Sequence, residues 1–200
     1  MQRTFWDERY GRPGYFYGTE PNDFLRAQAA DMPIGEVLCI GEGEGRNALH
    51  LARLGHRVTA VDQSEVGMAK LRERAAAEQL VVNAVVADLA EFDFGAARWN
   101  AIVSIFCHLP SALRANVHQR AAHALAPGGR LILEAYTPRQ LAFGTGGPSD
   151  PDMLCEAAAL RTELATLSFD HLVELEREVI EGPAHSGLAA VVQLVARRSA

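Results

Sequence analysis

From about residue 36 to residue 136, short apolar runs alternate with longer segments whose apolar residues recur every three or four positions. The runs have the length of strands, and the segments between them have the periodicity of helices with one buried face. A parallel sheet covered by helices on both faces needs this alternation, because its strands are buried on both sides. The predicted strands are 37–40, 57–62, 84–87, 101–106 and 131–136.

Helix boundary residues support this pattern. Residues 46–55 predict a helix that ends at Gly55, and Ser64 is a typical N-cap for the next helix. Ser111 is expected to open a third helix that includes Leu125 and closes at the following Pro-Gly-Gly.

The last third of the chain has a different pattern. Residues 171–182 and 188–198 are two longer β-like segments, joined only through residues 182–187. So short a link cannot make a parallel crossover, so the two segments are expected to pair antiparallel. The sequence therefore predicts an α/β fold: a Rossmann-like, doubly wound, seven-stranded sheet that is mostly parallel, with an antiparallel C-terminal hairpin.

The length of 200 residues is that of one domain. We divide it into an aromatic N-terminal cover segment (1–35), a core that binds a cofactor (36–136), and a cover loop, helix and hairpin (137–200). Three cysteines without metal-type spacing predict reduced thiols, no metal site and a cytoplasmic location. The absence of a long apolar stretch predicts neither a signal peptide nor a membrane span.

The net charge of −6 and a pI near 5.6 argue against a nucleic-acid partner, because phosphate binding needs clustered Lys and Arg. No polybasic patch points to a membrane either. We expect a small-molecule partner, and the sequence leaves the oligomeric state open.

The first predicted strand runs into the glycine-rich sequence GEGEGRN, residues 41–47. Dinucleotide sites have the spacing G-x-G-x-x-G, whereas here Gly41, Gly43 and Gly45 give G-x-G-x-G and Arg46 stands where the third glycine belongs. The loop also holds two glutamates. A carboxylate and a phosphate ~4 Å apart repel by about 1 kcal/mol even in bulk water, so a diphosphate cofactor is disfavoured.

A cofactor without phosphate and with a positive centre fits such a loop better, and S-adenosylmethionine has both properties. Asp62 ends the second strand 21 positions after Gly41, where a carboxylate can bind ribose hydroxyls. Asp88 ends the third strand beside Leu89, where it can accept from an adenine amine. The structural alternative is that each aspartate only caps a helix.

The order VLCIGEGEGRN, VTAVDQS, VVADL, WNAIVSIFCHLP and LAPGGRLILEAY resembles the class I S-adenosylmethionine-dependent methyltransferases over residues 36–136. Within them, the G-R-N ending of the loop and the aromatic N-terminal segment are most similar to the small tellurite-resistance and thiopurine-type methyltransferases. The resemblance implies S-adenosylmethionine as the cofactor. The residues that it places at the cofactor are Gly41, Glu42, Gly43, Gly45, Asn47, Asp62, Gln63, Asp88, Leu89, Ile105 and Phe106.

One position departs from the family pattern. Cys39 stands where the family usually carries an acid that helps to place the methionine part of the cofactor. Either Glu42 or Glu44 takes over this role, or the cofactor binds more weakly or in another pose. Glu42, which lies between two glycines, is the stronger candidate of the two.

Reacting groups of an open parallel sheet collect at the carboxyl ends of its strands. This rule nominates His108, Glu134 and His185 as catalytic residues, the last together with Glu181. Each has a structural alternative. His108 can bond the start of the next helix, Glu134 can pair with a buried cation, and His185 can be an exposed turn residue. Methyl transfer needs a base only if the acceptor must lose a proton.

The first 25 residues are rich in aromatic side chains, which suit a segment folded over an active site. We expect Arg9, Tyr17, Tyr136 and Arg139 to bind the acceptor, with the arginines as partners for an anionic one. The predicted function is therefore S-adenosylmethionine-dependent methylation of a small molecule, in detoxification of thiol, selenium or tellurium species. The alternatives are a non-catalytic S-adenosylmethionine-binding protein and, less well supported, an NAD(P)-dependent oxidoreductase.

Overall fold

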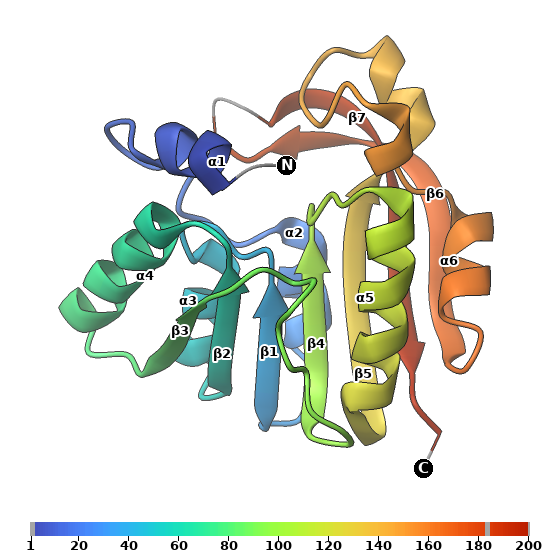
Figure 1. Cartoon of the computed structure of the whole chain (residues 1–200), viewed down its shortest axis with the longest axis horizontal. Helices are drawn as coiled ribbons and strands as arrows, with labels where there is room; N and C mark the ends of the chain where they lie inside the picture. The colour runs from blue at the N-terminus through green and yellow to red at the C-terminus, as the bar shows by residue number, and fades with distance from the viewer. Residues whose placement is uncertain (1–2, 183–184, 200) are drawn as a thin grey trace.

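The computed structural model describes residues 3–182 and 185–199 and contains one sheet of seven strands in the order β3-β2-β1-β4-β5-β7-β6 (Figure 1). The first five strands are parallel, and β6 and β7 join antiparallel beside β5. The predicted fold class is confirmed. The strands are β1 Glu36–Ile40, β2 Arg57–Asp62, β3 Val82–Val86, β4 Trp99–Ile105, β5 Leu125–Tyr136, β6 Ser168–Ile180 and β7 Ser186–Arg197. Pro183 and Ala184, in the predicted hairpin link, lie outside the described residues.

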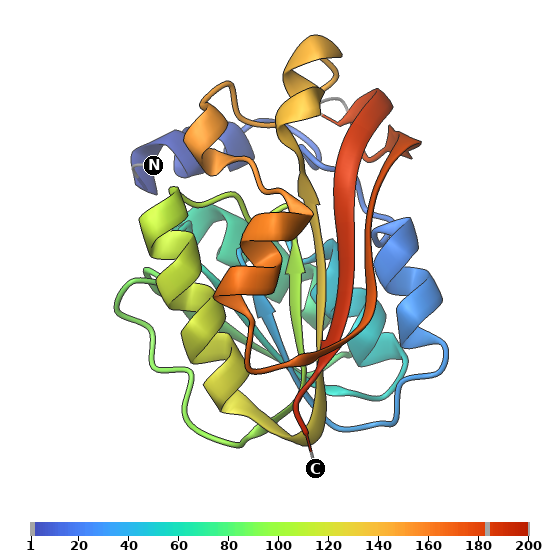
Figure 2. The same cartoon turned by 90° about the vertical axis from the view of Figure 1, so that its right-hand side faces the viewer.

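Helices cover both faces of the sheet (Figure 2). On one side α5 and α6 enclose one apolar cluster, and on the other α2, α3 and α4 enclose a second. The helices are α1 Arg3–Tyr10, α2 Asp23–Ala29, α3 Arg46–Arg53, α4 Glu65–Ala77, α5 Ser111–Ala124 and α6 Ala157–Glu163, with 3-10 turns at Pro138–Ala142 and Pro151–Met153. No helix in the described part of the chain is long and apolar enough to cross a membrane.

Strand β1 shows why the core strands are mostly apolar. Leu38 and Ile40 belong to the cluster under α5 and α6, whereas Val37 and Cys39 belong to the cluster under α2, α3 and α4. Side chains on a strand alternate between its faces, so almost every side chain of a strand covered on both faces is buried, and most of these side chains are apolar. Cys39 is fully buried for this reason.

The helix boundary signals hold at both predicted positions. Gly55 has φ +94°, which ends α3, and the His56 amide then donates to the Leu51 carbonyl at 3.1 Å. At the start of α4, Ser64 Oγ accepts from the Gly67 amide at 3.1 Å.

The end of the third predicted helix is corrected. Helix α5 stops at Ala124, and Leu125 already begins β5, where it pairs with Trp99. The register then shifts, because Ala101 pairs with Arg130. The Pro-Gly-Gly sequence is therefore an irregularity inside β5 and not a helix stop. Leu125 is fully buried in the core, which explains its helix-like spacing in the sequence. Strand β3 also begins two residues earlier than expected, at Val82.

The glycine loop after β1 packs directly against α4. Gly45 has φ +90°, and a Cβ at this position would lie 2.8 Å from Leu71 Cβ and nearer still to the end of that side chain. Leu71 is fully buried and has no room to move aside. The glycine thus fixes the distance between the loop and α4.

We expect Gly45→Ala to destabilise the protein by about 1–3 kcal/mol more than Gly128→Ala, as measured by urea unfolding. Gly128 is the matched control, since it has a similar φ of +75° but nothing within 4 Å of its Cβ position. The difference between the variants therefore isolates the contact with Leu71. Equal losses of stability would show that α4 yields to the extra methyl group.

Candidate cofactor and acceptor site

Two adjoining cavities lie at the carboxyl ends of the parallel strands. The larger has a volume of about 550 Å³ and the smaller of about 140 Å³, and both are lined by Trp6, Gly41, Phe106 and His108. They lie where the strand order reverses between β1 and β4, the usual ligand position in an open α/β sheet. Their combined volume suits a ligand of the size of a nucleoside derivative.

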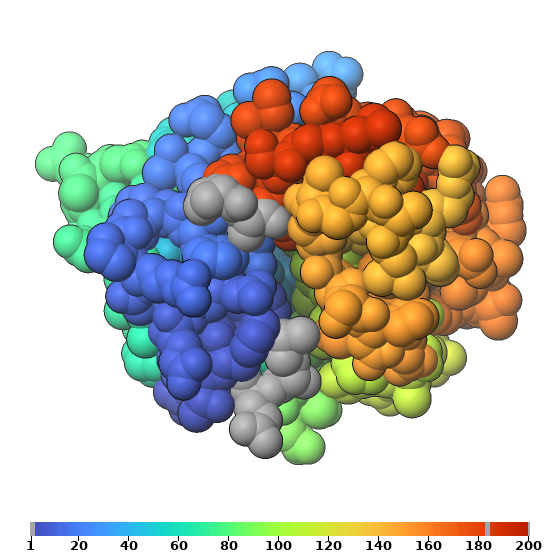
Figure 3. Space-filling view, turned by 90° about the horizontal axis from the view of Figure 1, so that it is seen from above, coloured from blue at the N-terminus to red at the C-terminus, as the bar shows by residue number. Residues whose placement is uncertain are grey.

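Two segments cover the larger cavity. Seen from above, the N-terminal segment (blue) and the segment after β5 (orange) face each other over the strand ends (Figure 3). The first contributes the rings of Phe5, Trp6, Phe16 and Tyr17, and the second contributes residues 146–150. The predicted aromatic cover is thus a short helix, α1, followed by a loop, and it lies on the site.

Glu42 explains why a glycine loop carries negative charge. Its carboxylate accepts from the Asn47 and Ala48 amides at 2.9 and 2.7 Å, so it occupies the N-terminus of α3 from within the chain. That helix end is where a Rossmann protein binds pyrophosphate. Burial raises the pKa of the Glu42 carboxyl to about 7, against the opposing effects of the two amides and Arg46.

Glu44 has a different task. It is buried, accepts from the Phe16 amide at 2.7 Å and forms an ion pair with Lys70 at 2.7 Å. This glutamate fastens the cover loop to α4. Of the two candidates to replace the family's acid, Glu42 is the one whose carboxylate lies at the start of α3, and Cys39 lines neither cavity.

The smaller cavity holds the predicted nucleoside-binding residues Asp62, Gln63, Asp88 and Leu89. Asp62 accepts from the Gly43 amide at 2.9 Å and from the Ser64 amide at 2.8 Å, so it shapes the loop as well as lining the cavity. Burial raises its pKa. A carboxylate has about four acceptor positions, which leaves some for a ligand.

Three further predicted cofactor residues, Glu42, Asn47 and Ile105, line the larger cavity, and Gly41 and Phe106 line both. Gly43 and Gly45 line neither, because they serve packing inside the protein. A Cβ at Gly43 would lie 2.5 Å from the Tyr10 hydroxyl, so this glycine makes room for the cover helix α1.

His108 lines both cavities, but its ring is committed to the fold. Its Nε2 accepts from the Tyr136 amide at 3.2 Å, and the ring stacks on Tyr136 with an interplanar angle of 4°. Burial and the nearby His185 lower the pKa of His108 to about 3. The ring is therefore neutral. Its Nε2 lone pair already accepts a hydrogen bond from a backbone amide, so it is not available as a base.

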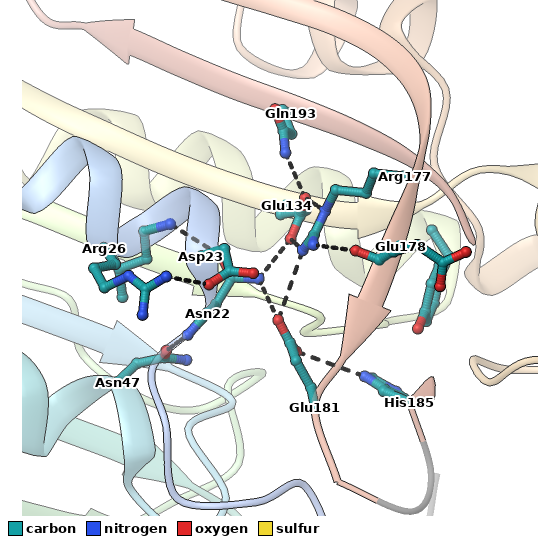
Figure 4. A network of polar contacts seen from close by, with 12 residues as sticks. Asn22, Asp23, Arg26, Asn47, Glu134, Arg177, Glu178, Glu181, His185 and Gln193 are labelled. Carbon is teal, nitrogen blue, oxygen red and sulfur yellow. Dashed lines mark hydrogen bonds and ion pairs between the residues drawn. The ribbon is translucent and has the colours of Figure 1, made fainter. Parts of the chain in front are cut away.

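Glu134 is placed behind the cavity wall and not in it. The side chain is fully buried and accepts two hydrogen bonds from Arg177, at 2.8 and 2.6 Å (Figure 4). Asn22 and Gln193 donate to the same carboxylate at 2.6 Å each. Of the two expectations for this residue, the buried cation is the observed one. The nomination of Glu134 as a catalytic residue is corrected, because four donors saturate it.

Of the four residues predicted to bind the acceptor, two line a cavity and two do not. Arg9 and Tyr17 line the larger cavity. Tyr136 lies in the adjacent wall, fully buried, and lines neither cavity. Arg139 is exposed and forms an ion pair with Glu176, away from both cavities. Its expected contact with the acceptor is corrected.

Sequence reasoning missed the roles of Asn22 and Arg46. Asn22 is fully buried, donates to Glu134 and Glu181 and caps α2. Arg46 lines the larger cavity and pairs with Glu181. A buried arginine needs a carboxylate partner, but the sequence does not show that this partner lies 135 positions away.

Comparison with known proteins finds similarity to methyltransferases. The family model for a methyltransferase domain matches residues 37–129. A protein-L-isoaspartate O-methyltransferase from Ectopseudomonas mendocina is 35% identical over 101 residues, which are 50% of this chain and 46% of that protein. The chain therefore spans less than half the length of this relative.

Two solved structures have the same fold. One, from work on the conversion of a disulfide bond into a thioacetal group during echinomycin biosynthesis, has a TM-score of 0.78 and 22% identity over 98% of this chain and 89% of that one. TehB from Haemophilus influenzae has a TM-score of 0.73 and 19% identity over 98% of this chain and 67% of its own. At these identities the likeness shows the fold alone.

The match over residues 37–129 is to a methyltransferase domain, and it supports both the class I resemblance and S-adenosylmethionine as the cofactor. The tellurite or thiopurine subtype, the small-molecule acceptor and the division of the chain into three segments stay predictions.

We expect the free energy of unfolding to fall by about 1–3 kcal/mol between pH 4.5 and pH 7 through Glu42. The folded pKa of about 7 exceeds the ordinary value of 4.5, so the folded chain keeps a proton that the unfolded chain loses as the pH rises. Urea unfolding at several pH values should show that the free energy of unfolding depends less steeply on pH in Glu42→Gln than in the wild type. Glu73→Gln, an exposed site on α4, should keep the wild-type slope. A wild-type slope in Glu42→Gln would contradict the expectation.

Proposed function

We propose that the protein is an S-adenosylmethionine-dependent methyltransferase that acts on a small-molecule acceptor. The observation that carries the proposal is the position of Glu42. Its carboxylate already binds the amides at the start of α3, so no phosphate can use this helix end. This argues against a dinucleotide and favours a cofactor with a positive centre.

The residues around the cavities fit S-adenosylmethionine. Asp62, Gln63 and Asp88 line the smaller cavity, where Asp62 and Gln63 would bind ribose hydroxyls and Asp88 would accept from an adenine amine. Gly41 and Glu42 line the larger cavity, where the methionine part would lie. The bound cofactor supplies a methyl group on a sulfonium. The chain positions the acceptor in line with that methyl group and excludes water by its aromatic cover.

The covers favour a small acceptor over a macromolecule. Residues from α1, the following loop and the segment 146–150 enclose the larger cavity, and the cofactor takes part of its volume of about 550 Å³. The relative that acts on protein isoaspartate makes an isoaspartyl peptide the rival acceptor, and the cover would have to move aside for it.

Arg9 favours an anionic group on the acceptor. Its guanidinium lies 4.4 Å from the centre of the Phe5 ring and 5.0 Å from that of Phe16, and it donates to the Tyr17 hydroxyl at 3.2 Å. No carboxylate of the described residues forms an ion pair with it, although it lines the cavity. A cation held between aromatic faces beside a cavity can bind an anionic ligand. Thiol, selenium and tellurium species belong in the acceptor panel.

Titration calorimetry should show binding of S-adenosylmethionine and none of NAD. Asp62→Ala should weaken S-adenosylmethionine binding by about 10-fold or more. The variant would lose both the hydrogen bonds to the ribose and the hydrogen bond that holds the Gly43 amide in the loop. Asp93→Ala is the control, since Asp93 is exposed and only accepts from the Gly95 amide. Binding of NAD in place of S-adenosylmethionine would overturn the proposed function. Binding without turnover across the acceptor panel would favour the non-catalytic alternative.

We expect Arg9→Ala to raise KM for anionic acceptors by about 10-fold or more while leaving affinity for S-adenosylmethionine unchanged. Arg139→Ala is the matched control, because it removes an exposed arginine that is already paired with Glu176. Turnover with a panel of charged and neutral acceptors measures both effects. An unchanged KM in Arg9→Ala would make a neutral thiol or hydroxyl compound the better acceptor.

A further inference from the structure

The hairpin of β6 and β7 brings one histidine into the larger cavity. His185, just before β7, lines this cavity together with Gly41 and Glu42 of the glycine loop. Its ring lies 4.5 Å from the centre of the Tyr17 ring, 4.8 Å from Phe106 and 5.2 Å from Tyr136. Three aromatic neighbours fix the orientation of the imidazole, so its two nitrogens point in set directions.

One ring nitrogen faces a carboxylate. His185 Nδ1 is buried, has no hydrogen-bond partner among the described residues, and lies 3.9 Å from Glu181 Oε2 (Figure 4). A neutral imidazole carries one proton, and a carboxylate beside Nδ1 favours the tautomer with the proton there. The lone pair is then on Nε2, on the other side of the ring.

Glu181 is held in place from two other elements. Asn22 donates to Oε1 at 2.7 Å, and Arg46 pairs with Oε2. Burial raises the pKa of Glu181, but His185, Arg46 and Asn22 outweigh it and bring the pKa to about 2. Glu181 is therefore ionised. Burial lowers the pKa of His185, with Glu181 acting against it, so the imidazole is neutral at pH 7.

We propose that His185 is the general base of the reaction and that Glu181 is the positioning residue that orients its ring. This rests on the proposed methyltransferase function and extends it to acceptors that must lose a proton. The other two histidine and carboxylate candidates are engaged, since His108 Nε2 accepts from an amide and Glu134 has four donors.

The step balances without a further reactant. The acceptor X–H loses its proton to His185 Nε2 while X forms a bond to the methyl carbon. The bond between that carbon and the sulfonium breaks, and its electron pair stays on the sulfur as a thioether. His185 becomes an imidazolium paired with Glu181, and the proton later passes to solvent. The charged and titratable groups that face His185 are Glu181, Arg46, Arg9, His108, Tyr17 and Tyr136.

A pair of acceptors tests the base directly. 4-Nitrobenzenethiol is ionised at pH 7, whereas benzyl mercaptan is protonated. His185→Gln should lower kcat for benzyl mercaptan by about 10²–10⁴-fold and leave kcat for 4-nitrobenzenethiol nearly unchanged. His123→Gln, an exposed site on α5, is the control and should behave as wild type. Equal effects of His185→Gln on the two thiols would overturn the proposal, since a merely structural role slows both.

A second measurement needs no turnover. NMR of protein labelled at the imidazole carbons follows the titration of each of the seven histidines, and the His185→Gln spectrum assigns His185. Glu181→Gln should lower the pKa of His185 by about one unit or more, because the negative partner is gone. Glu176→Gln, at an exposed acid of β6 five positions earlier in the chain, should leave the pKa of His185 unchanged. An unchanged pKa of His185 in Glu181→Gln would overturn the proposed pairing of His185 with Glu181. Failure of the wild-type chain to bind S-adenosylmethionine would instead contradict the proposed function.

Discussion

The buried carboxylate of Glu134 is the constraint that determines how the N-terminal segment and the C-terminal hairpin pack against the sheet. An ion taken out of water costs several kcal/mol unless partners replace the lost hydration. Its position inside β5 means that these partners must come from other elements: Arg177 from β6, Gln193 from β7 and Asn22 from the segment before α2. Satisfying one charge therefore aligns the C-terminal hairpin with the sheet and fastens the N-terminal segment beside it.

From Asn22 the network continues to the cavity. The same side-chain amide bridges Glu134 and Glu181, and Glu181 in turn pairs with Arg46 at the start of α3. The cover, the hairpin and the cofactor helix are thus connected through hydrogen bonds that are almost entirely shielded from solvent, where such bonds are strongest. The wall that carries His185 is thus built from segments far apart in the sequence that these contacts hold together.

The features of the fold and the site that could be predicted from the sequence are those that depend on residues close together in the chain. The existence and order of the strands, the Gly55 and Ser64 boundaries and the hairpin follow from periodicity and turn residues and were predicted correctly, whereas the starts of β3 and β5 were not. Leu125 was misassigned because a buried strand residue and a buried helix residue look alike at one position. The sequence brought Asp62 and Asp88 together correctly, because strand ends gather at one edge of a sheet and both residues line the smaller cavity. The partner of Glu134 could not be found, because pairing across 43 positions leaves no trace in spacing.

Ion pairs and hydrogen bonds within the chain also determine which charged side chains of the cavities are left to bind a ligand. Glu44 is neutralised by Lys70, Glu181 by Arg46, and Glu42 is turned onto the helix amides. The charged side chains that remain are Asp62 and Asp88 in the smaller cavity, and Arg9 and Asp150 in the larger. The carboxylates of the smaller cavity suit hydroxyls and amines, and Arg9 suits an anionic group. The proposed nucleoside cofactor and anionic acceptor match these two positions, so this division of charge is the feature that would link them in a single site.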